Sequence, residues 1–402
     1  EAPSVDDTSK RLGLSTTPSA VHILKTIHTA HGGKTSVARV LRGEVPDSAE
    51  LHLGGKHERV AGISSLLGAT MRKRGAARAG DTIGLARLDS FQTGDTLSTV
   101  KTGAQQVARL AAPAPVYGLA IELKDKKDEV KFSAAIAKLT EEDPSLRLDH
   151  AGETHQLVLW GQGEMHLRIT LERLKRKYGI DATPRRRQVP YKETIRATTS
   201  IRARHKKQSG GHGQFGDVHL EIKPLPRGQG FQFTEKIHGG TVPKQYIPSV
   251  EIGVKDYLTT GPLGFPVVDV SVTLLDGSYH SVDSSDMAFR QAGRQAMSEG
   301  LPQCQPVLLE PVMAVSIVTP SDATARLTGI VTQRRGQLLG YAARNDWPGW
   351  DVIEARLPES EMDNLIVDIR SATAGVGSYT ATFDHLHEVT GKLADQILAA
   401  HK

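Results

Sequence analysis

Short apolar runs separated by glycine-rich turns fill residues 19–112. Runs such as VARVLRGEV and AELHLGG alternate between apolar and polar positions, which is the period of a half-buried β-strand. The glycines of AGDT and TGDT fall between such runs, where they suit tight turns. Because many short strands at regular spacing are typical of all-β folds, this stretch is predicted to form a β-barrel.

Strands alternate with amphipathic helices in residues 113–187, after the prolines of AAPAPVYG mark a linker. The order is strand, helix, strand, strand, helix, strand, which predicts a ferredoxin-like domain. The apolar positions of its second helix recur at the helical period: Leu167, Leu171, Leu174 and Tyr178. Gly179 is placed to end that helix. Residues 306–402 repeat the order without obvious sequence identity, so a second ferredoxin-like domain is predicted there.

Residues 188–305 lie between these stretches and read as a further α+β domain. YKETIRATTSIRARHKKQ alternates like a long strand, and a glycine-rich loop, further strands and two helices follow. The second helix is predicted to begin at an N-cap provided by Asp283 or Ser284 and to end at Gly300. The predicted fold class is therefore a multidomain protein, a β-barrel followed by three α+β domains.

The composition is that of a globular protein with several domains. A length of 402 residues exceeds the usual size of one core, and 38% hydrophobic and 24% charged residues are ordinary values. A net charge of +5 is compatible with a nucleic-acid partner without demanding one. Cys304 is the sole cysteine, which excludes an intrachain disulfide and fits a reducing cytosol. No apolar run is long enough to cross a membrane.

The segment HTAHGGKTSV ends like a phosphate-binding P-loop but differs from one in two respects. The first glycine of that motif is replaced by His28, and the following SVARVLRGEV reads as a strand where a P-loop needs a helix. The preferred interpretation is a hairpin turn carrying His31, Gly32, Gly33 and Lys34. Since Asn-Lys-x-Asp is also absent from the sequence, no nucleotide hydrolysis is predicted for this chain.

The loop RARHKKQSGGHGQFGDV is the most unusual stretch of the sequence. It combines basic side chains, uncharged hydrogen-bonding groups and glycines around a single Phe215 that could stack on a base. Charge supplies affinity for RNA, and a bare backbone fits an irregular groove. Composition leaves two interpretations open, an RNA-contacting loop and a solvated hairpin tip.

Other candidates are weaker on composition alone. The basic clusters Lys175-Arg176-Lys177 and Arg185-Arg186-Arg187 are candidate sites, but complementation of a helix dipole and a solvated face also explain them. His280 stands alone in a loop, where a histidine is usually only exposed. His385 and His387 would share one strand face, but no second cluster completes a zinc site.

Several long motifs together resemble bacterial elongation factor G. QSGGHGQFGDVHLEIKP, GGTVPKQYIPSVEIGV, DGSYHSVDSSDMAFRQAGRQA and LLEPVMAVSIVTP occur in the order of that family, over almost the whole chain from about Val21 onward. The resemblance implies domains II to V of the factor without its GTPase domain. The implied division is 1–18 for the trailing edge of the missing GTPase domain, 19–112 for the barrel, 113–187 for domain III, 188–305 for the tRNA-mimicking domain IV, which is similar to ribosomal protein S5, and 306–402 for domain V.

The resemblance also implies site residues and partners. Domain IV of such factors reaches the decoding region of the small ribosomal subunit, where its loop tips contact tRNA and mRNA. The matching positions are Gln208, Ser209, Gly210, Gly211, His212, Gly239, Gly240, Ser278, Tyr279 and His280, and weaker candidates for RNA contact are Lys206, Lys207, Arg334 and Arg335. The implied partners are the ribosome, rRNA, tRNA and mRNA, for a cytoplasmic monomer without membrane contact. No metal or cofactor is implied for this chain, whereas GTP and Mg²⁺ would bind the full-length parent.

Some positions depart from the family pattern. Gly375-Val376-Gly377 stands where the family usually has Gly-Arg-Gly, and GQGEMHL has Gln162 and Met165 where Met and Leu are commoner. These differences suggest an elongation-factor-G-like paralogue, for which ribosome recycling or ribosome protection is an alternative to translocation. An RNA-binding protein that acts alone is the alternative from a different class.

Overall fold

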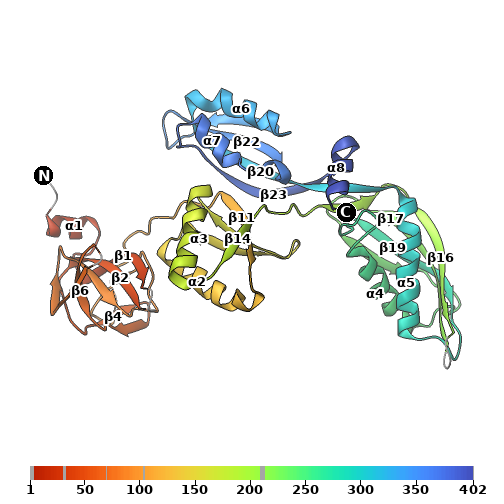
Figure 1. Ribbon diagram of the computed structural model, residues 1–402, viewed down its shortest axis with the longest axis horizontal. Coiled ribbons are helices and arrows are strands. Elements are labelled where there is room, and N and C mark those ends of the chain that lie inside the picture. The colour runs from red at the N-terminus through yellow and green to blue at the C-terminus, as the bar shows by residue number, and fades with distance from the viewer. Residues whose placement is uncertain (1–3, 30–32, 69, 103–104, 209–212, 402) are drawn as a thin grey trace. The chain divides into compact units, whose positions relative to one another are not determined.

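A computed structural model describes residues 4–29, 33–68, 70–102, 105–208 and 213–401 of the chain. The chain divides into two compact units, Glu1–Arg187 and Gln188–Lys402. The helices and strands of both units are labelled in Figure 1. Each unit has its own hydrophobic cores, so each is described by itself.

The first part of the N-terminal unit is all-β apart from the short helix α1 (Val5–Arg11). Its main sheet has the antiparallel order β10-β1-β2-β9-β6-β7, with strands β1 (Ala20–His28), β2 (Lys34–Arg42), β6 (Ile63–Leu67), β7 (Thr70–Arg74), β9 (Thr82–Ala86) and β10 (Thr96–Leu97). Two small antiparallel pairs accompany it, β3 (Glu44–Pro46) with β8 (Ala76–Arg78) and β4 (Glu50–Leu53) with β5 (Lys56–Arg59). The alternation seen in the sequence puts one face inside, where Val21, Ile23, Val40, Ile83 and Leu85 are buried.

The predicted closed barrel is wrong for the strands that the structure describes. The order of the main sheet runs from β10 to β7, and these two edge strands do not pair with each other. The strands other than β1 and β2 are short, and register shifts interrupt the β1–β2 ladder at Ala20/Val21 and Ile23/Lys25. Local alternation shows that each strand has a buried face, but it does not show which distant edges form hydrogen bonds.

The second part of the N-terminal unit has the predicted order of elements. These are β11 (Tyr117–Leu123), α2 (Glu129–Glu142), β12 (Arg147–Ala151), β13 (Gln156–Gly161), α3 (Glu164–Tyr178) and β14 (Ala182–Arg185), after a 3₁₀ turn at Lys126–Asp128. The strands lie in the antiparallel order β12-β13-β11-β14. Phe132, Ile136 and Leu139 of α2 pack with Leu167 and Leu174 of α3 in one core. Gly179 ends α3 in the left-handed region at φ 68°, as its position predicted.

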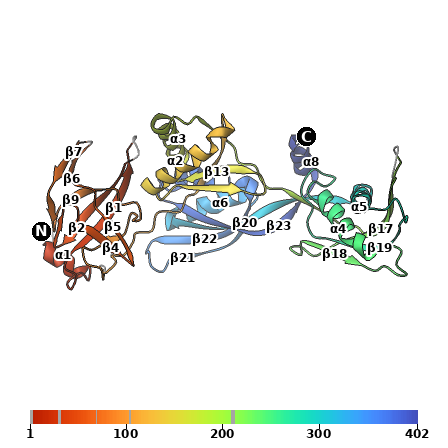
Figure 2. The same ribbon diagram turned by 90° about the horizontal axis from the view of Figure 1, so that it is seen from below.

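The C-terminal unit begins with β15 (Lys192–Ile195) and then forms a four-stranded sheet of order β16-β17-β19-β18. Its elements are β16 (Thr199–Lys207), β17 (Gln214–Pro224), β18 (Phe231–Glu235), α4 (Ile247–Leu258), preceded by a 3₁₀ turn at Lys244–Tyr246, β19 (Val270–Ser278) and α5 (Asp286–Gly300). α4 and α5 lie on the same face of this sheet (Figure 2). They approach closely because Gly253 leaves room: a Cβ there would lie 2.0 Å from the carbonyl oxygen of Arg290.

The N-cap of α5 is Ser285, one or two residues after the positions predicted for it. The Ser285 side chain accepts a hydrogen bond from the Ala288 amide. Asp283 and Ser284 are bonded to the start of β17 instead, so tertiary contacts decide among three neighbouring residues that can all cap a helix. The end of α5 at Gly300 agrees with the prediction.

The remaining sheet is organised around the long strand β20 (Pro306–Pro320), which follows a 3₁₀ turn at Leu301–Cys304. One edge of β20 pairs with β15 and then with β22 (Trp350–Pro358), which also pairs with β21 (Gln337–Ala343); the other edge pairs with β23 (Ser378–Val389). The helices are α6 (Thr324–Gln333), α7 (Leu365–Ala372) and α8 (Gly391–His401), with 3₁₀ turns at Ser321–Ala323 and Glu359–Glu361. β20 to β23 with α6 and α7 thus repeat the order seen in the first unit.

A buried carboxylate organises the junction beside β15. Glu193 accepts hydrogen bonds from the amides of Leu263 (2.9 Å) and Phe265 (3.2 Å). A Cβ at Gly261 would lie 2.2 Å from the Glu193 carboxylate, so only glycine fits there. Phe265 in turn stacks on His401 of α8, with ring centroids 4.1 Å apart. Glu193 therefore holds the loop on which the C-terminal helix packs.

Glu193 is expected to make the stability of this unit depend on pH. Burial raises its pKa from 4.5 to about 7, although the amides of Leu263, Phe265 and Gly264 oppose the shift. Between these two values the folded protein holds a proton that the unfolded chain releases, so the free energy of unfolding should fall as pH rises. Urea unfolding of the wild type and Glu193→Gln across this range should give a difference that changes with pH. A constant difference would contradict the assignment.

Candidate nucleic-acid interface

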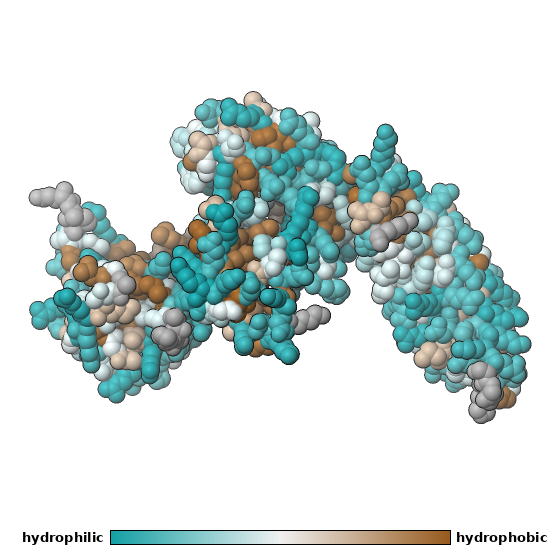
Figure 3. Space-filling model, in the orientation of Figure 1, coloured by the Kyte–Doolittle hydropathy of each residue, from teal (hydrophilic) through white to brown (hydrophobic). Residues whose placement is uncertain are grey.

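The β16–β17 hairpin carries three of the described positions expected to contact RNA, Lys206, Lys207 and Gln208. Lys207 pairs with Gln214 at the last described rung, and Lys206, Lys207 and Gln208 are exposed beside it. The expected contact residues Ser209, Gly210, Gly211 and His212 lie outside the described residues. The face of β16, β17 and α5 seen in Figure 3 is mostly hydrophilic.

Residues 280–285 are bonded directly to the start of β17. The Phe215 amide donates to the carbonyl oxygen of Asp283 (2.8 Å), and the Ser284 hydroxyl donates to the carbonyl oxygen of Phe215 (2.9 Å). The Gly213 amide donates to the Asp283 carboxylate at 3.1 Å. These bonds bring the SYH segment to the end of the hairpin, where the rings of Phe215 and His280 are 6.2 Å apart. Two motifs separated by about sixty residues in sequence thus form one surface.

The His280 ring is fixed with one nitrogen turned inward. Its Nδ1 accepts hydrogen bonds from the amides of Val282 (3.3 Å) and Asp283 (3.2 Å). A proton on Nδ1 would pair with the Asp283 carboxylate at 3.3 Å, but the two amides would then face a donor. The neutral tautomer with its proton on Nε2 satisfies both amides. Nε2 is then the hydrogen-bond donor that the half-exposed ring can offer to a ligand.

Exposed apolar side chains surround His280, and the sequence interpretation missed two of them. Tyr279 is 51% exposed, and Val282 and Met287 are 64% and 51% exposed. Ser278, at the end of β19, is only partly exposed. An aromatic ring beside hydrogen-bond donors is the combination that binds unstacked RNA bases. The signal in the sequence was three apolar residues of SYHSVDSSDM, Tyr279, Val282 and Met287, which do not follow the period of a buried strand or helix face.

The basic face of the hairpin is held by one buried acid that the sequence interpretation also missed. Asp217 is fully buried, and its two carboxylate oxygens accept from Arg202 Nε (2.8 Å) and Arg204 Nε (2.7 Å). The Arg204 guanidinium also lies over the Phe215 ring at 5.8 Å. Both arginines remain about half exposed, so Asp217 sets their direction without removing them from the surface.

The Gly239-Gly240 turn borders this surface through the segment that follows it. Both glycines are exposed and have positive φ angles of 72° and 71°, which L-residues rarely adopt. The Tyr246 hydroxyl, a few residues later, donates to the carbonyl oxygen of Ser284 at 3.2 Å. The structure therefore places the turn and residues 280–285 on elements that share a contact.

Arg334 and Arg335 are engaged within their own domain. Arg334 pairs with Asp368 and donates to the carbonyl oxygen of Asp363 at 2.9 Å. Arg335 binds both oxygens of the buried Glu310, at 2.8 and 2.9 Å. Glu310 and then Glu361, which also pairs with Arg335, raise the pKa of Arg335 further above its usual range. Such contacts favour a structural role for the pair over the expected contact with RNA.

Lys34 lies in the β1–β2 hairpin, as the sequence interpretation expected for the Gly-Gly-Lys-Thr segment. Its ammonium group is buried, donates to the carbonyl oxygens of Phe91 (2.7 Å) and Asp89 (3.3 Å), and pairs with Glu141 of α2. His31 and Gly32 of the expected turn lie outside the described residues. The ammonium group of Lys34 is therefore bound by protein groups, whereas the lysine of a P-loop is directed at a phosphate.

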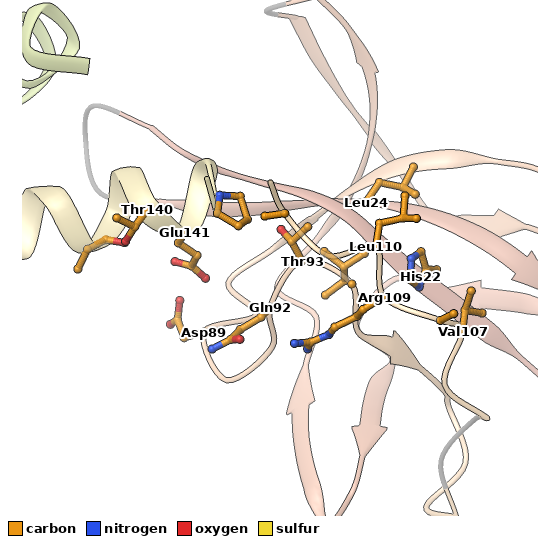
Figure 4. Close-up of a pocket in the computed structure, with 16 residues that line it drawn as sticks. His22, Leu24, Asp89, Gln92, Thr93, Val107, Arg109, Leu110, Thr140 and Glu141 are labelled. Atoms are coloured by element: carbon orange, nitrogen blue, oxygen red, sulfur yellow. The ribbon is translucent and has the colours of Figure 1, made fainter. Parts of the chain in front are cut away.

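A cleft of about 850 Å³ lies between β1, residues 107–112 and α2 of the N-terminal unit (Figure 4). Several of its polar side chains are bonded to protein groups. His22 Nδ1 lies 3.0 Å from the Thr96 hydroxyl, burial lowers the pKa of His22, and Arg109 pairs with Asp95. Among the described residues, no three or more His, Cys, Asp or Glu side chains are grouped so that they could hold a metal ion, here or elsewhere. Among the described helices, none is both long and apolar enough to span a membrane.

Comparison with known families agrees with this arrangement. Three family models match consecutive parts of the chain: "Elongation Factor G, domain III" at residues 112–186, "Elongation factor G, domain IV" at residues 187–305 and "Elongation factor G C-terminus" at residues 307–397. An "Elongation factor G-like protein" from Synechocystis sp. is 50% identical over 400 residues, which is 99% of this chain and 59% of that protein.

A solved structure has the same multidomain α+β fold. A crystal structure of a protein from Thermus thermophilus superposes with a TM-score of 0.78 at 31% identity, covering 98% of this chain and 59% of the other. The chain thus spans about three fifths of the length of the relatives that it matches. The matched domains and this whole-chain similarity show that the chain belongs to the elongation factor G family of translation factors.

Proposed function

We propose that this chain is the ribosome-binding part of an elongation-factor-G-type protein and promotes movement of tRNA and mRNA through the decoding region. The observation that carries the proposal is the tip surface, made of Gln208 with its neighbours in the hairpin and the anchored residues 278–285. The proposal includes an all-β domain II, ferredoxin-like domains III and V, and an S5-like domain IV with the boundaries expected from the sequence. It also includes action as a cytoplasmic monomer with rRNA, tRNA and mRNA as partners.

The tip would act by occupying space and by forming hydrogen bonds, without chemistry of its own. The outward Nε2 of His280 would donate to a phosphate, ribose or base oxygen, and Tyr279 would stack on a base. The RNA phosphate backbone would be attracted by the positive charges of Arg202, Arg204 and Lys206. This part would need no cofactor, since GTP and Mg²⁺ would be bound elsewhere in the full-length protein.

Replacing His280 with alanine is expected to weaken ribosome binding about tenfold, because one outward donor and its ring contact are lost. His280→Gln keeps a donor of similar reach and should retain most of the affinity. The measurement is sedimentation with vacant ribosomes over a salt series. His57→Ala, which changes another exposed histidine, is the matched control. Equal binding by wild type and His280→Ala would place the contact away from the tip.

A second candidate function is that of a divergent paralogue acting in ribosome recycling or protection. It is favoured by the 50% identity to a protein described as elongation factor G-like. The full-length protein should be tested for single-round translocation and for splitting of post-termination ribosomes. Splitting activity without translocation would favour the paralogue.

A further inference from the structure

Ion pairs and a backbone hydrogen bond cross the seam between the β1–β2 hairpin and α2, and they involve the two acidic residues there, Glu141 and Glu142. Glu141 receives Lys34 and also His28, whose Nε2 lies 2.7 Å away. Glu142 accepts from the His28 amide at 2.6 Å and from Lys177 Nζ at 2.7 Å. These contacts fix the hairpin against α2 and α3 and neutralise both carboxylates.

An open cleft of about 680 Å³ lies beside this seam, between β1 and α3. Its remaining acid, Asp143, also has partners within the protein. The Asp143 carboxylate accepts a hydrogen bond from the Ser145 amide at 3.0 Å and lies 3.0 Å from His166 Nε2. Lys25 of β1 and Arg173 and Arg176 of α3 also line the cleft.

Lys25, Arg173 and Arg176 differ from Lys34 and Lys177, which form ion pairs with Glu141 and Glu142. All three are exposed, and among the described residues they make neither an ion pair nor a side-chain hydrogen bond. Arg173 and Arg176 are one helical turn apart, and Lys25 comes from a different element. Complementing the dipole of α3 would explain the arginines but not Lys25 on the facing strand.

We infer that this cleft is a second nucleic-acid contact, separate from the tip, which holds an RNA phosphodiester backbone between Lys25 and the two arginines. A pocket for one small anion would bury its cations, whereas these are solvated and arranged along an open groove. A protein partner would need an apolar or aromatic centre, whereas charged and polar side chains make up most of this lining. Guanidinium groups on a helix face suit phosphates by bidentate hydrogen bonding. The identity of the RNA as ribosomal rests on the proposed function, but the RNA contact itself does not.

The test is fluorescence anisotropy of a labelled short RNA hairpin with the full chain over a KCl series. Arg173→Gln/Arg176→Gln is expected to lower affinity about tenfold and to reduce the slope of log K against log[KCl] by about 1.5, the value for two lost phosphate contacts. Lys25→Gln should reduce the slope by about half as much. Arg72→Gln/Lys73→Gln removes the same charge from exposed β7 and should change both quantities much less. Circular dichroism should confirm that each variant is folded.

The result separates this inference from the proposed function. The loss of RNA affinity caused by Arg173→Gln/Arg176→Gln should be the same with and without His280→Ala, because the two sites are separate. If the wild type does not sediment with ribosomes while the arginine double variant still loses affinity for the RNA, only the proposed function is overturned. Wild-type affinity in the arginine double variant, or an equal loss in the β7 control, would overturn the cleft. Displacement of the hairpin by polyglutamate at equal charge concentration would also overturn it, because the cleft would then accept any polyanion.

Discussion

Replacing Phe289 with alanine is expected to lower the free energy of unfolding of residues 188–402 by about 3–5 kcal/mol. Phe289 is fully buried in the core between α5 and the sheet. It stacks on Tyr246 with centroids 4.8 Å apart and planes 16° apart. Alanine would leave a cavity beneath Tyr246, whose hydroxyl holds the carbonyl oxygen of Ser284. The loss should therefore extend to the anchored tip residues as well as to the core.

Urea unfolding followed by circular dichroism measures the first effect, and amide hydrogen exchange of residues 280–285 measures the second. Met287→Ala is the matched control, since Met287 lies on the same helix with half of its surface exposed. Its cost should be about 0.5 kcal/mol or less. A cost below about 1 kcal/mol for Phe289→Ala would mean that the core rearranges to fill the cavity.

Replacing Lys34 with alanine should destabilise the N-terminal unit by about 3 kcal/mol. The ammonium group is buried, so its removal leaves Glu141 with His28 alone and deprives the carbonyl oxygens of Phe91 and Asp89 of their donor. Lys25→Ala changes an exposed lysine of the neighbouring strand and should cost about 0.5 kcal/mol or less. The measurement is urea unfolding of each variant.

The same pair of variants distinguishes a structural lysine from a phosphate-binding one. A structural Lys34 predicts that nucleotide titration gives the same result for the wild type and Lys34→Ala. A loss of nucleotide affinity in Lys34→Ala, without loss of stability, would contradict the contacts with Glu141 and Phe91. The comparison would then restore the P-loop interpretation of the Gly-Gly-Lys-Thr segment.

Local patterns predicted the elements wherever the local signal and the packing agree. Leu167 and Leu174 lie on one face of α3 and are both buried, and Gly179 ends the helix by the conformation that glycine favours. The strands before and after Gly33 pair as a hairpin, as the apolar and polar alternation on both sides predicted. In these cases the hydrophobic periodicity of a single segment already determines which side chains are buried.

The remaining features depend on partners distant in the sequence. The sequence pattern put Lys34 in a hairpin turn and Asp217 in a glycine-rich loop, and only the folded chain shows that both are buried against opposite charges. Ser284 could cap α5 as well as Ser285 does, and its bond to Phe215 decides between them. The contacts of Arg335 with Glu310 likewise join residues whose pairing the sequence did not indicate.

The pairing of β15 with β20 has a mechanical consequence. The segment carrying the hairpin leaves the sheet after Ile195 and returns at Pro306, and these two residues are register partners in one ladder. Arg196 and Arg227 add ion pairs to Glu388 at the end of β23. A module joined by a single strand could swivel about it, but one joined by two hydrogen-bonded strands resists torsion. A rotation of the β20 sheet would therefore be transmitted to the hairpin as a rigid rotation, and the displacement of each atom would grow with its distance from that joint.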